Sequence, residues 1–117
     1  MSADASELRS LGHDLTKVST QAAVRAIRVT EKVAADITRD SKMGAPVDTG
    51  NLKNSIGWDM TNRNGEVGAE IGPTANYGGY VEFGTSNAAA QPYLSPAFKR
   101  HVPNYEKALG MLADGVV

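Results

Sequence analysis

The tripeptide Asp48-Thr49-Gly50 is the pattern in this chain that most directly suggests chemistry. In aspartic proteases two such loops bring their carboxylates together, and the pair shares a proton because like charges so close cannot both ionise. A homodimer of this chain could supply the second aspartate. Here, however, the motif follows Met43-Gly44-Ala45-Pro46 rather than an apolar strand. A dimeric aspartic protease is therefore the weakest of the functions that we consider.

A local structural role explains the same residues. The Asp48 carboxylate can accept hydrogen bonds from the backbone N–H groups of a short helical turn over residues 50–53, and Thr49 can do so more weakly. Leu52 would then enter the core. This interpretation predicts no catalytic residue in the motif.

Other titratable residues give little support for an enzyme. Glu82 could act as a general base, but no nucleophile is identifiable beside it, so we favour a buried ion pair or a backbone cap. His13 and His101 have no partner at the spacing of a metal site, and the chain has no cysteine. Phosphate-binding and dinucleotide-binding motifs are missing from the sequence. We predict neither a cofactor nor a bound metal.

Length and composition predict one globular domain, residues 1–117. The chain is 41% hydrophobic and 21% charged, which is ordinary for a folded protein. Its net charge of −1 provides no general attraction to nucleic acid or to an anionic membrane. No run approaches the roughly 20 apolar residues of a membrane span, and the acidic N-terminus is unlike a signal peptide. We expect a protein made in the cytoplasm, without a membrane partner.

A long helix is predicted for residues 1–43. Between residues 4 and 40 there is no proline, and apolar residues recur at intervals of three and four, as on one face of a helix. They are Leu8, Leu11, Leu15, Val18, Ala22, Ala26, Val29, Val33 and Ile37. A helix of about 37 residues would be ~55 Å long and would exceed the body of a domain this size. Part of it would then pack on another subunit, unless it breaks near Gly12 or Ser19-Thr20 into a hairpin.

Two other faces of this helix bear on function. A second apolar face is formed by Ala23, Val24, Ile27, Ala34 and Ala35, and it calls for a second partner. We predict that the subunit interface includes Leu8, Leu11, Leu15, Val18, Val24 and Ile27. A third, basic strip contains Lys17, Arg25, Arg28, Lys32 and Arg39. It could face DNA in a channel, although charge strips are more often solvated faces with ion pairs.

The middle of the chain, residues 45–94, predicts a β-hairpin and loops. Residues 55–60 and 67–71 alternate between apolar and polar or small residues, which is the period of a strand, and Asn64-Gly65 favours a tight turn between them. Residues 76–85 could form a helical turn or an extended strand. Residues 86–91 form a linker of small residues.

The C-terminal residues 95–114 predict an amphipathic helix. Ser95 is suited to the N-cap and Pro96 to the first helical position. Pro103 is expected to kink this helix or to split it after His101 or Val102. The predicted fold class is thus α+β, with a long N-terminal helix, a small antiparallel sheet built on a hairpin and a C-terminal helix.

Three segments, taken together, resemble the neck, head-to-tail joining or tail-completion proteins of long-tailed bacteriophages. The segments are residues 45–52, 80–85 and 91–94, and with the intervening elements the resemblance covers most of the chain. The residues that carry it are Pro46, Asp48, Thr49, Gly50, Leu52, Tyr80, Glu82, Phe83, Gly84, Thr85 and Pro92. The chain departs from the pattern in its small-residue linker at residues 86–90.

This resemblance implies a structural virion protein that forms a homo-oligomeric ring around the DNA passage. The ring would lie in the head-to-tail connector or at the head-proximal end of the tail, after assembly in the host cytoplasm. Its partners would be other copies and neighbouring connector and tail proteins, with non-specific contact to DNA. An alternative is a small oligomeric regulatory or DNA-binding protein that uses the basic strip.

Overall fold

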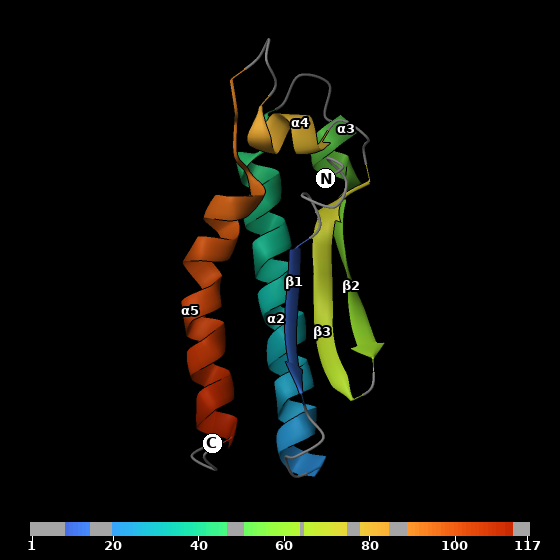
Figure 1. The fold of residues 1–117 in the computed structure, drawn as a ribbon, viewed down its shortest axis with the longest axis vertical. Coiled ribbons are helices and arrows are strands. Elements are labelled where there is room, and N and C mark those ends of the chain that lie inside the picture. Colours follow the sequence, from blue (N-terminus) through green and yellow to red (C-terminus); the bar gives the residue numbers. More distant parts are fainter. Residues whose placement is uncertain are drawn as a thin grey trace.

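The computed structural model describes residues 9–14, 20–46, 51–63, 65–74, 78–84 and 89–113. Its elements, in order, are β1 (Arg9–Asp14), α2 (Thr20–Gly44), α3 (Asn51–Ser55), β2 (Ile56–Arg63), β3 (Glu66–Pro73), α4 (Gly78–Phe83) and α5 (Leu94–Ala113). Figure 1 shows α2 between α5 and the sheet, with α3 and α4 near the end where α2 terminates. The predicted α+β class is confirmed.

The three strands form one antiparallel sheet in the order β1-β3-β2. The predicted hairpin is β2 and β3, with Trp58 opposite Ile71 and Met60 opposite Ala69. Gly65 has a φ of 83° in the connecting turn, a left-handed conformation that glycine adopts at little cost. The alternating pattern therefore predicted this hairpin correctly.

Residues 9–14 are a strand, so the prediction of one helix over residues 1–43 is wrong in this part. β1 pairs antiparallel with β3, and Leu11 lies opposite Ala69. The long helix, α2, begins only at Thr20. Pairing with β1 provides backbone hydrogen-bond partners for the second edge of β3, which would otherwise be unpaired. The predicted interface residues Leu8, Leu15 and Val18 lie outside the described residues.

The shorter helix removes one argument for a subunit contact. With 25 residues, α2 is about 37 Å long. The described structure extends 50 Å along its longest axis, so α2 does not exceed the body of the molecule. Ala26 and Ile37 of its apolar stripe are buried in the core that α2 shares with α5 and the sheet of the same chain, and Val29 and Val33 are partly buried against it. An interface with another subunit must be argued from other features.

The core lies between α2, α5 and the inner face of the sheet. From α2 it includes Ala26 and Ile37, as the helical period predicted, and it joins Leu109 of α5 to Ile71 of β3. Ala34, from the second apolar face of the helix, has no exposed surface and is buried in the same core.

A polar contact crosses this core. The Thr30 hydroxyl donates to the Ala26 carbonyl at 2.8 Å and lies 2.9 Å from the Tyr105 hydroxyl. Since the Thr30 proton is used, Tyr105 donates to Thr30. Burial raises the pKa of Tyr105. The contact satisfies two buried hydroxyls and fixes the register of α2 against α5.

Helix α5 runs through Pro103 as one element, so of the two predicted outcomes, a kink or a split, the split is wrong. Proline has no N–H for the carbonyl of Lys99, which loses its helical partner. Lys99 and Pro103 both lie on the exposed side, where water can hydrate that carbonyl. The buried side chains of Tyr105 and Leu109 continue the packed face beyond the proline.

We predict that Ile37→Ala lowers the free energy of unfolding by about 2–5 kcal/mol, because it leaves a cavity at a position with no exposed surface. Met43→Ala on the same helix, where the residue is 75% exposed, should change it by less than about 0.5 kcal/mol. Urea unfolding, followed by the fluorescence of the single tryptophan, Trp58, measures both. Equal effects of the two substitutions would contradict this core.

Candidate functional site

The motif residue Glu82 caps the first turn of α5. One carboxylate oxygen accepts hydrogen bonds from the backbone N–H groups of Tyr93 at 2.9 Å and Leu94 at 2.7 Å. The other accepts from the Ser95 hydroxyl at 2.8 Å and the Ser95 N–H at 3.3 Å. The first N–H groups of a helix have no partner within the helix, and the helix dipole favours a negative charge there. Glu82 therefore has a structural role, as the preferred interpretation predicted.

The pKa of Glu82 reflects these hydrogen bonds to the start of α5. Burial by itself would raise it, since the side chain is only 3% exposed. The N–H groups of Leu94 and Tyr93, together with Ser95, lower it further than burial raises it. The pKa therefore lies below its ordinary value, and the carboxylate is ionised at neutral pH. A lowered pKa makes Glu82 a weaker base than an ordinary glutamate.

Two more hydrogen bonds join the same segments. The Tyr93 hydroxyl, on a side chain that is 1% exposed, donates to the Gly78 carbonyl at 3.1 Å. The Gln91 N–H donates to the Val81 carbonyl at 2.8 Å. The structure thus brings into contact residues 78–84 and 91–95, which include described residues of the sequence motifs at 80–85 and 91–94.

Helix α4 decides between the two structures expected for residues 76–85, since residues 78–83 are helical. Gly84 follows it with a φ of 80°, the left-handed conformation that often ends a helix. Phe83 is 49% exposed. Only the backbone of Tyr80 is described, and Thr85 lies outside the described residues.

The sequence motif of residues 45–52 begins just after α2 and ends within α3. Pro46 is half-buried just after α2, and α3 begins at Asn51. Leu52 is 4% exposed and belongs to the core, as predicted. The described residues end at 46 and resume at 51, so Asp48, Thr49 and Gly50, with their predicted capping, lie outside them.

Asp40 joins α2 to α5 through charged hydrogen bonds. Its Oδ2 atom lies 2.6 Å from Nε2 of His101 and 2.9 Å from Nη1 of Arg100. His101 and then Arg100 hold the pKa of Asp40 below its usual value, against the effect of burial. No sequence signal points to this role of His101, because it lies 61 positions from Asp40 along the chain.

Ion pairs neutralise part of the basic strip. Asp36 is bonded to Lys32 at 2.9 Å and to Arg39 at 3.2 Å, and these contacts hold its pKa below the ordinary value. Arg25 and Arg28, also exposed, have no ion pair within the described part of the chain. Among its described residues, the strip therefore has ion pairs along its C-terminal half. Lys17 lies outside the described residues.

Of the predicted interface residues, Val24 and Ile27 lie on α2. Val24 is 44% exposed and Ile27 is half-buried. Leu11 lies in β1, where only the backbone is described.

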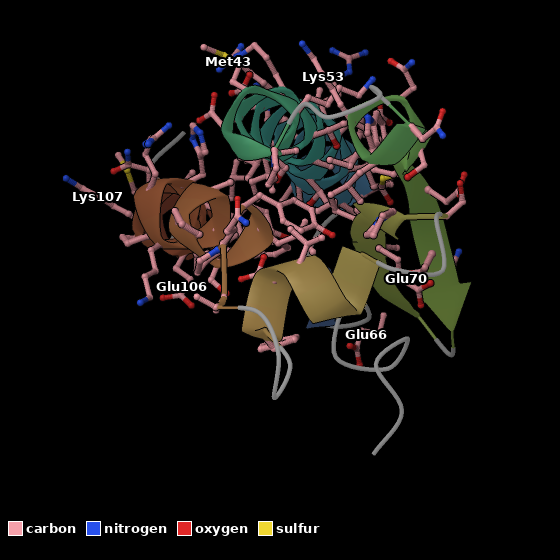
Figure 2. The ribbon with its side chains drawn as sticks, turned by 90° about the horizontal axis from the view of Figure 1, so that it is seen from above. Met43, Lys53, Glu66, Glu70, Glu106 and Lys107 are labelled. Atoms are coloured by element: carbon pink, nitrogen blue, oxygen red, sulfur yellow. The ribbon has the colours of Figure 1, made fainter. Side chains whose placement is uncertain are left out.

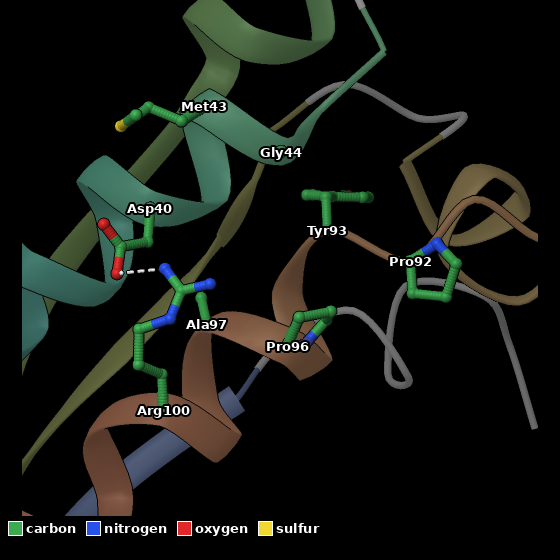
Figure 3. Close-up of a pocket in the computed structure, with 8 residues that line it drawn as sticks. All are labelled: Asp40, Met43, Gly44, Pro92, Tyr93, Pro96, Ala97 and Arg100. Atoms are coloured by element: carbon green, nitrogen blue, oxygen red, sulfur yellow. Dashed lines mark hydrogen bonds and ion pairs between the residues drawn. The ribbon is translucent and has the colours of Figure 1, made fainter.

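Two hollows lie between α2 and α5. The first, of about 270 Å³, is drawn in Figure 3, where Asp40 and Arg100 pair on one side while Pro92, Tyr93 and Pro96 approach from the start of α5. The second, of about 310 Å³, is an apolar groove whose edge carries two arginines. Its lining residues are Arg25, Arg28, Val29, Ala108, Met111 and Leu112.

Within the described residues, no group of three or more acidic, histidine or cysteine side chains could hold a metal ion. The same residues contain no helix of the length and apolarity needed to span a membrane.

The chain matches a family model over residues 9–84, nearly two thirds of its length. That family is HK97-gp10-like, described as "Bacteriophage HK97-gp10, putative tail-component". The protein belongs to this family, which confirms the resemblance to structural proteins of tailed phages. Comparisons with curated proteins and with solved structures gave no match.

We predict that Glu82→Gln lowers the free energy of unfolding by about 1–3 kcal/mol at pH 7, because it removes the charge from a cap that serves three backbone N–H groups. A carboxyl group whose pKa is lowered by folding stabilises the protein above its ordinary pKa, 4.5 for Glu82, and this stabilisation is lost as the pH falls through the folded-state value. The difference between wild type and variant should therefore shrink below pH 4.5.

Urea unfolding at a series of pH values measures this difference. Glu106→Gln, at an exposed position of α5, is the control and should match the wild type throughout. A Glu82→Gln effect that stays constant with pH would argue against an ionised cap.

Proposed function

We propose that this protein is a non-enzymatic structural component of a tailed-phage virion that assembles as a homo-oligomeric ring. Membership of a phage tail-component family carries the proposal, since the family covers residues 9–84. The proposed position is the head-to-tail connector, or neck, or the head-proximal end of the tail. It rests on the resemblance of residues 45–52, 80–85 and 91–94 to neck proteins.

The geometry around Glu82 supports a scaffold rather than a catalyst. Its described contacts are the backbone N–H groups of Tyr93, Leu94 and Ser95 and the Ser95 hydroxyl, all at the start of α5. The contact holds α4 and the start of α5 in one arrangement. A fixed arrangement of these segments suits a structural protein that must bind its neighbours in a defined orientation.

The protease alternative is disfavoured by what flanks its motif. Asp48-Thr49-Gly50 stands between α2, which ends at Gly44, and α3, which begins at Asn51. The corresponding loop of an aspartic protease lies within an all-β fold. The regulatory or DNA-binding alternative is also weakened, because Asp36 and Asp40 neutralise Lys32 and Arg39.

We expect the purified protein to form a ring, or to join the junction when mixed with tails and DNA-filled heads of the same phage. Light scattering measures the mass of the protein alone, and electron microscopy locates it in the mixtures. A truncation that lacks residues 1–20 would not test assembly alone, because it would also remove β1 from the sheet. A monomer or small dimer that binds neither heads nor tails would refute the proposal.

Asp48→Asn separates the structural function from the protease. We expect the variant to assemble as the wild type does, and neither form to cleave a denatured protein substrate. Peptidase activity in the wild type that the variant lacks would instead establish the protease.

A further inference from the structure

The strand β2 lies at an edge of the sheet, and its outer side has no strand partner within the described residues. Its ladder with β3 runs from Ile56 to Arg63 without a change of register, so no β-bulge bends it. Folded proteins usually protect such edges with bulges, prolines, lysines or short strands, because free backbone groups invite pairing with another chain. β2 has eight residues and contains neither proline nor lysine. It is therefore an unprotected edge.

The register identifies the backbone groups of β2 that point away from β3. In an antiparallel ladder, opposite residues alternate between pairs that exchange hydrogen bonds and pairs that do not. The Thr74 N–H donates to the Ser55 carbonyl at 3.1 Å, so every second pair from Ser55 onward is a bonded one. The intervening residues of β2 direct their N–H and C=O groups outward, and they are Ile56, Trp58, Met60 and Asn62. None of them is charged.

The strand β1 has a free side of the same kind, and Figure 1 shows it on the opposite side of β3 from β2. Alternate residues of β3 are bonded to β2, so the remaining ones bond to β1. The β1 residues whose backbone groups point away from β3 are consequently Ser10, Gly12 and Asp14. Within the described part of the chain, the sheet thus ends on both sides in a row of donors and acceptors without a strand partner.

We propose that β2 of one copy pairs with β1 of the next copy, so that the sheets of neighbouring subunits join into one. This inference rests on the proposed ring. The two edges are different patches on opposite sides of one chain, and such a head-to-tail contact closes a ring when the rotation between copies is right. Strand addition at an exposed edge is a common mode of recognition, in which main-chain hydrogen bonds supply the affinity.

The arrangement of the sheet identifies a second copy, rather than a strand of another protein, as the partner of β2. A foreign strand on β2 would leave the edge at β1 unpaired in every subunit. In a closed ring of copies, one type of contact satisfies both edges, and no free edge remains. β1 and β2 also run in the same direction, because each is antiparallel to β3. Copies related by rotation about an axis along the strands would therefore meet as parallel strands.

Proline substitutions on each edge test this contact. Asn62→Pro removes an outward N–H from β2, and Ser10→Pro removes one from β1, while the donors to β3 remain. Each variant should need more than about tenfold higher concentration to assemble, because proline lacks the donor and its ring obstructs the approaching strand. Asn62→Ala and Ser10→Ala, which keep the N–H, are the matched controls and should assemble as the wild type does.

A mixture of the two proline variants distinguishes this contact from other modes of association. The Ser10→Pro copy keeps an intact β2 and the Asn62→Pro copy an intact β1, so one joint can form between them. At a concentration where the wild type forms a ring and each variant alone is monomeric, light scattering of the equimolar mixture should give the mass of a dimer. Assembly of Ser10→Pro alone at the wild-type concentration would contradict the use of β1 and indicate pairing of β2 with β2.

Hydrogen exchange tests the edge without any substitution. The N–H groups of Trp58 and Met60 should exchange at least about tenfold more slowly in the assembled protein than in the dissociated chain. Circular dichroism checks that the proline variants are folded. If the wild type assembles only on heads or tails, its incorporation there, seen by electron microscopy, replaces the mass as the readout.

Exchange that assembly leaves unchanged, or normal rings from the folded Asn62→Pro variant, would overturn this contact while leaving the ring in place. Asn62→Pro rings that form normally but no longer join heads or tails would assign the edge of β2 to another virion protein. A wild type that never associates, even with heads and tails, would reject the proposed function itself.

Discussion

The carboxylate of Glu82 is the interaction on which the arrangement of this fold most depends. It is almost wholly buried and ionised, and it satisfies backbone N–H groups at the start of α5 from a different helix, α4. A buried charge without partners would be strongly unfavourable, so the hydrogen bonds of Glu82 favour this one geometry of α4 and α5. The hydrogen bond from Tyr93 to Gly78 and the left-handed Gly84 support the same corner. Two motifs that are separate in the sequence are therefore one structural unit.

From this contact between α4 and the start of α5, helix α5 runs back along α2. The two helices are joined by polar contacts at two places along their length. Asp40 contacts Arg100 and His101 near the corner, and Thr30 meets Tyr105 further along. The buried apolar residues fill the space between these polar contacts. Hydrophobic burial supplies most of the favourable free energy, whereas the polar contacts select one register between the helices. A constant relative position of α2 and α5 also fixes the groove between them.

Sequence patterns were sufficient where the structure is determined locally. The hairpin followed from alternation and Asn64-Gly65, and α5 from its apolar period. Sequence patterns failed where contacts between distant parts of the chain determine the local structure. Residues 9–14 offer one apolar residue, Leu11, and form a strand because β3 has an edge to pair. Pro103 stays within a helix because tertiary packing continues past it. The sequence favoured a backbone cap or a buried ion pair for Glu82. It did not identify the partners, Tyr93, Leu94 and Ser95, which lie 11 to 13 positions further along the chain.

The distribution of charge on α2 follows from the same contacts. Asp36 and Asp40 lie towards its C-terminal end, where they pair with Lys32, Arg39 and α5. Of the described cations of the basic strip, Arg25 and Arg28 remain without an ion pair, and they lie near the N-terminal end of α2 beside exposed Val24 and the apolar groove. An apolar surface bordered by arginines is typical of protein interfaces, in which arginine is enriched and lysine depleted. The ion pairs of Asp36 and Asp40 within α2 therefore determine which arginines of the strip keep an uncompensated charge.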